Sequence, residues 1–275
     1  LTTTPKIAIS GVSSVTATNM SGSGTTWTYT YTAPAGDGTE TIVFSVGTDA
    51  AGNTVTATPT SGATFTVDNT SPSMIITAAD VSTGSTTNDS TLALTFITNE
   101  ATSNFVVTDI AVTNGSLSSF VSTDDDTYTA TFTPDGDGAT TIDVAAGAYT
   151  DAAGNNNTAA SQFAWTYDGT GPTMTIASTT SGVTDGSTTN DASIALTFTS
   201  SEVTTNFVVT DITVTNGALS SFAGSGKNYT ATFTATADGA TTIDVIAGKF
   251  TDDYGNQNDA SNTYNWIQDD TSPTG

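Results

Sequence analysis

The stretch LALTFITNEATSNFVVTDI, residues 92–110, returns with few changes as IALTFTSSEVTTNFVVTDI, residues 194–212. The match continues on both sides at an offset of roughly 101 residues, which indicates an internal repeat. For example, residues 128–132, YTATF, return as residues 229–233. The chain is therefore predicted to contain at least two copies of one structural unit.

Each copy has the pattern of a β-structure. Apolar side chains alternate with polar ones at Leu92, Leu94 and Phe96, and Asn114-Gly115 marks a turn between two such runs. Thr, Ser, Gly, Ala, Asn and Asp dominate the composition, with Val, Ile and Phe as the apolar part, which favours short strands and many turns. We predict an all-β chain of three tandem immunoglobulin-like β-sandwich domains, each seven-stranded with Greek-key connections, joined end to end.

A shorter and more divergent unit precedes the two clear copies. It keeps an alternating strand at residues 27–31 and the turn Asp49-Ala50-Ala51-Gly52-Asn53, and every unit closes on the motif D-x-T-[SG]-P. Proline keeps the residue before it extended, so these connections are expected to be short and stiff. The predicted units are 1–69, 70–169 and 170–270, with 271–275 as the start of a further repeat or a linker.

The charge of the chain excludes several classes of partner. There are 27 acidic residues against three basic ones, and the formal net charge is −24. Such a chain is repelled by nucleic acid and by anionic membranes. It has no His and no Cys, and no apolar run approaches the roughly 20 residues that span a bilayer. We expect no nucleic-acid partner, no membrane insertion by this segment and no cysteine or histidine chemistry.

Three motifs resemble those of bacterial Ig-like domains in large repetitive adhesins and surface proteins. They are the closing D-x-T-x-P, the D-x-x-G-N turn before the last strand, and the Phe-x-x-x-Glu of residues 96–100 and 198–202. The resemblance covers almost all of the second and third units, whereas the first lacks a clear counterpart of the glutamate. It implies a long extracellular chain at the cell surface, domains joined end to end, and calcium at the joints.

Strand directions in a sandwich predict where acidic side chains meet. Strands that run alternately up and down bring the end of the second strand, the loop after the sixth, and the exit of the preceding unit to one joint. Hard oxygen ligands without His or Cys suit Ca²⁺, which takes about six to eight oxygens. The alternative is that these acids only cap turns. The predicted ligands are Asp68, Glu100, Asp151 and Asn155 at one joint, and Asp168, Glu202, Asp252 and Asn256 at the next.

Other acids are expected to be solvated turn residues. A second cluster at the far end of the middle unit is a weaker alternative, because the third unit keeps only Asp238 in the loop that matches Asp135 and Asp137. Asp124-Asp125-Asp126 is expected to be an exposed hairpin turn. The candidate members of the second cluster are Asn88, Asp89, Asp109, Asp135 and Asp137.

Four functions compete on this sequence. The first is the calcium-stiffened stalk of a cell-surface adhesin, and the second is a subunit of an extracellular filament or surface layer whose partners are further copies. A glycan-binding module needs exposed aromatic platforms, yet Tyr149, Phe250 and Tyr254 are expected to pack beneath their loops. An enzyme is disfavoured, because the acidic residues recur in each repeat, whereas catalytic residues usually occur once.

Overall fold

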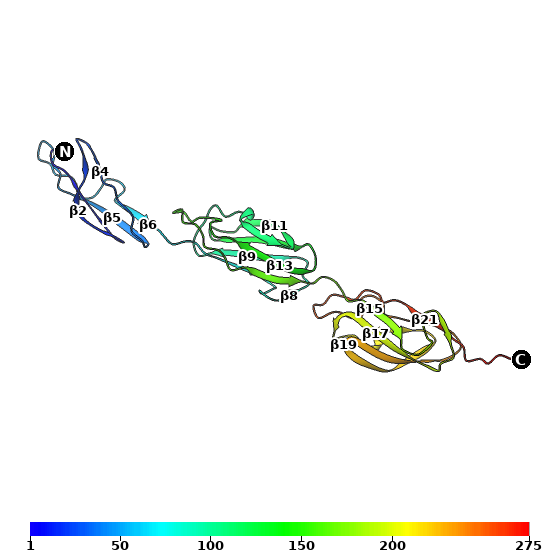
Figure 1. The fold of residues 1–275 in the computed structure, drawn as a ribbon. Helices are drawn as coiled ribbons and strands as arrows, with labels where there is room; N and C mark the ends of the chain where they lie inside the picture. The colour runs from blue at the N-terminus through cyan, green and yellow to red at the C-terminus, as the bar shows by residue number, and fades with distance from the viewer. Residues whose placement is uncertain (275) are drawn as a thin grey trace.

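The structure is a computed structural model that describes residues 1–274. Its three parts follow one another in line, with the two termini at opposite ends of an elongated molecule (Figure 1). We call them the N-terminal unit (β1 to β6), the middle unit (β7 to β14) and the C-terminal unit (β15 to β21). Apart from two single-turn 3₁₀ helices, η1 (Val107–Asp109) and η2 (Val209–Asp211), the regular structure of these residues is β-strand.

The middle unit is a sandwich of two four-stranded sheets. One has the order β11-β12-β9-β7 and the other β10-β13-β14-β8. In β9 every second side chain is buried, as the alternation of Leu92, Leu94 and Phe96 predicts. The strands are β7 (Met74–Ala78), β8 (Thr86–Thr87), β9 (Leu92–Thr98), β10 (Ile110–Thr113), β11 (Gly115–Ser122), β12 (Thr127–Pro134), β13 (Gly138–Val144) and β14 (Phe163–Tyr167).

The C-terminal unit repeats this architecture. Its sheets have the orders β15-β17-β19 and β16-β21-β20-β18. β19 is a single long strand where the middle unit has the hairpin β11–β12, so the same sandwich has one strand fewer. The strands are β15 (Met174–Ser178), β16 (Ser187–Thr189), β17 (Ser193–Thr204), β18 (Thr213–Val214), β19 (Gly217–Ala235), β20 (Gly239–Asp244) and β21 (Tyr264–Gln268).

Each sandwich has its own aromatic core. Phe132 and Trp165 meet edge to face in the middle unit at a centroid distance of 4.9 Å, and Phe233 and Trp266 do so in the C-terminal unit at 4.8 Å. The four side chains are buried, which confirms the expectation that both tryptophans are core residues. Burial of this aromatic and aliphatic surface is the main source of stability of each unit.

The expected count of seven strands holds for the C-terminal unit, whereas the middle unit has eight. In both units the first strand is divided between the two sheets. β7 pairs antiparallel with β9, and β8 then pairs parallel with β14 in the opposite sheet. The chain crosses between them through a turn in which Gly84 has a φ of +84°, a conformation that glycine adopts without strain. The first strand of each sandwich thus contributes to both sheets.

The N-terminal unit is a less complete structure. It has one four-stranded sheet of order β2-β1-β5-β6 and a separate ribbon, β3-β4. Its buried hydrophobic side chains are Ile7, Ile9 and Val67. A third full sandwich is thus not shown, and the domain limits stay a prediction. The strands are β1 (Lys6–Ser10), β2 (Ser14–Asn19), β3 (Ser21–Ser23), β4 (Thr26–Thr28), β5 (Gly38–Ser45) and β6 (Thr64–Val67).

Two observations concern the ends and the environment of the chain. Of the predicted further repeat or linker at 271–275, Gly275 lies outside the described residues. Within residues 1–274, no helix has the length and apolar character needed to cross a membrane.

Candidate metal sites at the joints

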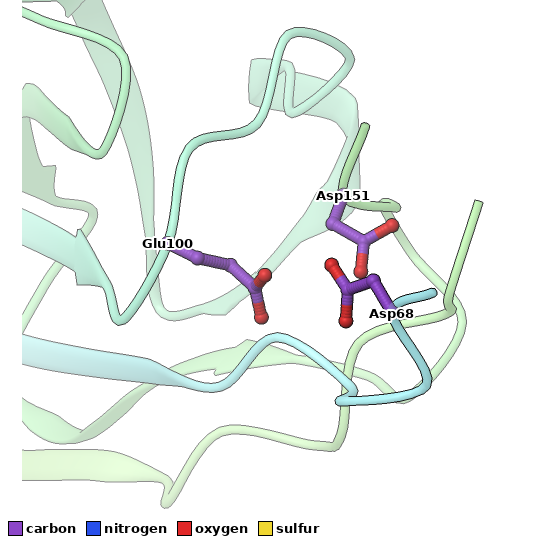
Figure 2. A group of neighbouring side chains, drawn as sticks. All are labelled: Asp68, Glu100 and Asp151. Atoms are coloured by element: carbon purple, nitrogen blue, oxygen red, sulfur yellow. The ribbon is translucent and has the colours of Figure 1, made fainter. Parts of the chain in front are cut away.

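The first candidate site lies where the N-terminal unit joins the middle unit. Asp68 follows β6, Glu100 follows β9, and Asp151 belongs to the D-x-x-G-N turn after β13. Figure 2 shows their carboxylates turned toward one another. One carboxylate oxygen from each residue lies within 4.8 Å of the others. We call this group the first trio.

The D-x-x-G-N turn fixes the direction of Asp151. Its Oδ1 accepts the backbone N–H groups of Gly154 (2.7 Å) and Asn155 (2.8 Å), and its Oδ2 accepts the side-chain amide of Asn155 at 2.8 Å. Gly154 has a φ of +95°, which explains the glycine of the motif. The turn is tied to the segment after Glu100, because the Thr102 hydroxyl donates to the Thr150 carbonyl at 2.8 Å. Asp151 is thereby held in place next to Glu100.

Asn155 joins two members of the trio. Its side-chain amide nitrogen donates to the carbonyl of Asp68 at 3.1 Å as well as to Asp151. The residue therefore presents N–H groups, and not its oxygen, to both aspartates. Asn155 thereby orients the two aspartates, and its predicted role as a metal ligand stays a prediction.

The first trio carries uncompensated negative charge. Glu100 Oε1 is buried without a hydrogen-bond partner, and burial, followed by the charges of Asp151 and Asp68, raises the pKa of Glu100 above its usual value. Tyr149 lies close by, and its buried hydroxyl also has no partner. Burial and the charge of Glu100 raise the pKa of Tyr149 to about 12. A bound cation would remove the repulsion and supply a partner for the buried oxygen.

The second trio, Asp168, Glu202 and Asp252, repeats the first at the next joint, again with one oxygen from each within 4.8 Å of the others. Asn256 donates to Asp252 Oδ2 at 2.8 Å and to the Asp168 carbonyl at 2.9 Å. Burial raises the pKa of Glu202, and the charges of Asp168 and Asp252 add to the effect, while Lys227 opposes it. The structure thus brings together the six predicted carboxylates as two groups of three.

The second joint also has contacts across the two sandwiches. The side-chain amide of Asn88 in the middle unit donates to Asn256 Oδ1 at 3.3 Å. Asn256 thereby uses its oxygen for a contact with the neighbouring unit, and its predicted role as a metal ligand stays a prediction. Gly171 lies very close to the D-x-x-G-N turn of the C-terminal unit. A Cβ atom added at position 171 would lie 1.9 Å from the carbonyl oxygen of Gln257. A larger residue at this point therefore requires the joint to shift.

The N-terminal unit has the turn without the trio. Asp49 Oδ1 accepts the backbone N–H groups of Ala51 and Asn53, the same two positions that Asp252 Oδ1 binds in the C-terminal unit. Two carboxylate groups of metal-binding geometry occur among residues 1–274, and neither includes Asp49. The motif alone thus marks a turn, and the site requires the glutamate and the aspartate of the incoming segment.

The exit of each unit has another shared feature, which we call the Asp clamp and which was not predicted from the sequence. Asp37, Asp137 and Asp238 each precede a strand glycine, and each carboxylate accepts a backbone N–H and a threonine hydroxyl from the D-x-T of its unit's exit. The spacing from the aspartate to the residue whose N–H it accepts is 32 residues in every unit, a signal that a search for fixed spacings would have found. The pairs are Asp37 with Asn69 and Thr70, Asp137 with Gly169 and Thr170, and Asp238 with Asp270 and Thr271.

Three aspartates of the candidate second cluster each have a separate hydrogen-bond partner. Asp137 holds the exit segment, Asp109 Oδ2 caps the 3₁₀ turn by accepting the Val106 N–H at 2.8 Å, and Asp89 Oδ2 accepts the Thr87 hydroxyl at 2.6 Å. The solvated-turn expectation is right for Asp135, which is exposed, and it misses the structural part of Asp137. Asp124, Asp125 and Asp126 are exposed in the hairpin turn, as expected.

Replacing Asp137 by asparagine is expected to loosen the exit of the middle unit. The hydroxyl of Thr170 and the N–H of Gly169 hold the pKa of Asp137 below its usual range. Because a lowered pKa stabilises the folded state only above the pKa of the unfolded chain, about 4, the wild-type advantage should be complete at neutral pH and disappear as the pH falls below that value. We expect a loss of about 0.5–1 kcal/mol at pH 7, small because the clamp is exposed.

Thermal unfolding of wild type and Asp137→Asn at pH 7, 5 and 3 checks this expectation. Asp135→Asn is the matched control, since it makes the same charge change in the same exposed loop, away from the exit segment. A difference from wild type that is equal at all three pH values contradicts the clamp, as does an equal effect of the control.

The aromatic residues beside the turns give little support to a sugar-binding platform. Tyr149 and Phe250 are buried, as expected, and Phe250 packs against Phe207 at a centroid distance of 5.0 Å. The expectation is wrong for Tyr254, which is 45% exposed. Its backbone N–H donates to Asp252 Oδ1 at 2.8 Å, and the residue lines a hollow beside the second trio together with Asp252.

The chemistry of the trios suits a hard divalent cation. Each supplies carboxylate oxygens from three separate segments, and neither contains a nitrogen or sulfur ligand. Calcium accepts mixed shells of carboxylates, backbone carbonyls and water, whereas magnesium demands a nearly ideal octahedron. Three carboxylates leave room for the remaining ligands to come from the backbone and solvent.

A sequence profile for the bacterial Ig-like domain matches residues 68–167 and again residues 168–267. The chain therefore belongs to the bacterial Ig-like domain family. Each match begins at the aspartate of a trio, Asp68 or Asp168, so each trio lies within one copy of the domain. A search of curated proteins found no match.

Three solved structures have a distant likeness to this chain. Invasin, described as a bacterial integrin-binding protein, is 16% identical over 87% of this chain and 49% of its own, with a TM-score of 0.37. Yersinia pseudotuberculosis InvD is 17% identical over 76% of this chain and 62% of its own, with a TM-score of 0.32. The C-terminal domain of Streptococcus agalactiae BspA, an AgI/II polypeptide, is 10% identical over 72% of this chain and 100% of its own, at 0.38. The chain spans about half the length of invasin, and these likenesses do not extend to function.

Proposed function

We propose that this chain is a stalk segment of an extracellular, cell-surface adhesive or structural protein, in which calcium at the two joints holds neighbouring units in line. The observation that carries the proposal is the pair of trios. Each gathers three carboxylates where the connecting segment meets the next unit, and the first leaves a buried oxygen without a partner. The partners of each unit are its neighbours in the same chain, and the proposal includes no catalytic role.

The position of the trios links cation binding to stiffness. Asp68 belongs to the segment between two units, while Glu100 and Asp151 belong to the body of the second of them. A cation shared by all three therefore fixes the connecting segment to that body. Without the cation, repulsion among the carboxylates pushes the segment away. The hydrogen bonds from Asn155 to the Asp68 carbonyl and from the Thr158 N–H to the Pro72 carbonyl then oppose that repulsion.

The first test is calcium removal from the whole chain. Adding EDTA is expected to lower the melting temperature of the middle and C-terminal units, since a cation that binds only the folded state stabilises it by mass action. Small-angle X-ray scattering is expected to show a shorter maximum dimension as the joints begin to bend. Restoring calcium in excess should reverse both changes.

Magnesium at the same concentration and ionic strength serves as the control, because a general effect of divalent charge on so acidic a chain would appear with both ions. If EDTA changes neither the melting temperature nor the scattering profile, the calcium part of the proposal is wrong. Melting that responds while the dimensions do not would retain the metal site and reject its role in stiffness.

A further inference from the structure

The two trios have surroundings of opposite charge, although their ligands match. The residue two before Tyr128 in the middle unit is Asp126, and the residue two before Tyr229 in the C-terminal unit is Lys227. The two tyrosines occupy equivalent places, because Tyr128 pairs with Phe96 and Tyr229 pairs with Phe198. A negative charge in the turn before β12 of the middle unit is thus replaced by a positive charge within β19 of the C-terminal unit.

Lys227 lies at the second trio. A hollow of about 240 Å³ is lined by the three trio residues and by Lys227. The ammonium group donates to the carbonyl of Ser201, the residue before Glu202, at 2.7 Å. This contact holds the lysine at the edge of the hollow, where its charge offsets part of the charge of the carboxylates.

The matching region of the middle unit has no lysine. Its exposed hairpin turn carries Asp124, Asp125 and Asp126, and Asp125 lines a hollow of about 220 Å³ together with Ala152, the residue that follows Asp151. The C-terminal unit has one further acid of its own, since Asp253 takes the place of Ala152. Lys227 and Asp253 together carry no net charge beside the second trio. The hairpin of the middle unit carries three negative charges, and its backbone carbonyls at Asp125 and Asp126 accept the N–H groups of Thr102 and Thr98, on either side of Glu100.

We propose that the residue two before the buried tyrosine, Asp126 in the middle unit and Lys227 in the C-terminal unit, gives the two joints different cation affinities, so that the first trio fills at lower calcium than the second. The inference rests on the proposed calcium sites. Lys227 acts as a tethered cation at the second trio: its positive charge repels an incoming calcium ion and lowers the affinity of that trio for calcium. The rod would then stiffen in two steps, first between the N-terminal and middle units and then between the middle and C-terminal units.

The test measures each site separately in the whole chain. Glu202→Gln leaves only the first trio intact, and Glu100→Gln leaves only the second. Calcium titration by calorimetry is expected to give the tighter dissociation constant for the chain that retains the first trio. Adding Lys227→Gln to the Glu100→Gln chain is expected to tighten binding at the second trio roughly threefold to tenfold, as removal of one nearby positive charge implies at a partly screened surface site.

Two controls separate charge from structure. Lys6→Gln makes the same charge change in the N-terminal unit and should leave the affinity of the second trio unchanged. In 1 M KCl the effect of Lys227→Gln should shrink toward none, because salt screens an electrostatic effect and leaves a packing effect in place. The opposite change, Asp126→Lys in the Glu202→Gln chain, alters the local charge by two units and is expected to weaken binding at the first trio by at least as large a factor.

The outcomes distinguish this inference from the proposed function. Calcium binding at both trios with equal constants, or with no response to Lys227→Gln and Asp126→Lys, overturns the inference and leaves the calcium stalk standing. An absence of calcium binding in wild type and in both single-site chains overturns the proposed sites and the inference with them. An effect of Lys227→Gln that persists in 1 M KCl also rejects the tethered-cation role.

Discussion

Glu100→Gln is expected to have opposite effects on stability with and without calcium. In EDTA the variant should melt a few degrees above wild type, because one of three mutually repelling carboxylates loses its charge while the shape of the side chain is kept. With calcium at 100 times the dissociation constant, wild type should gain about 2.7 kcal/mol. For a unit of about 100 residues this is a rise of roughly 10–20 °C, which the variant should lose.

Differential scanning calorimetry of both proteins, in EDTA and in calcium, gives the four melting temperatures needed. Asp135→Asn is the control of equal charge change, at the loop that faces the other end of the same unit. Its two melting curves should shift together with those of wild type. A Glu100→Gln chain that keeps the full calcium-dependent rise would show that the glutamate is not a ligand.

The second large effect is expected in the core of the middle unit. Phe132 is fully buried, meets Trp165 edge to face, and has its ring tip against Gly115, where a Cβ would lie 2.2 Å from Cζ. Phe132→Ala removes these contacts and leaves a cavity between the two sheets. The loss of unfolding free energy is expected to be about 3–5 kcal/mol. Urea unfolding should show an earlier transition for the middle unit alone.

Two further variants make this expectation specific. Phe233→Ala should produce the same loss in the C-terminal unit, because Phe233 occupies the matching place against Trp266. Val121→Ala, at a side chain that is 51% exposed, should change stability by less than about 0.5 kcal/mol. A loss below 1 kcal/mol for Phe132→Ala would contradict the core position of its ring.

Much of the fold could be predicted because the repeat appears in the sequence twice. The alternation in β9 fixes which face of the strand is buried, and the direction of the strands then brings Glu100 and Asp151 to one end. Both features follow from the period of a strand and the connectivity of a sandwich. That these residues bind calcium stays a prediction.

Other features could not be predicted because they depend on details that a pattern does not contain. The transfer of the first strand from one sheet to the other depends on the conformation of a turn at Gly84. The orientation of Asn155, with its nitrogen toward the aspartates, depends on the local hydrogen bonds of the folded turn. The role of Lys227 depends on the path of β19, which carries it to the rim of the second trio.

The Asp clamp has a consequence for how the molecule responds to a pull. Tension applied between the termini passes through each connecting segment, and that segment is gripped on one side by the clamp of the preceding unit and on the other by the asparagine of the following one. These bonds bear the force before any strand of a sandwich does. Sudden extension should therefore first release a short length of connecting chain, whose extension would take up part of the load while both cores remain folded.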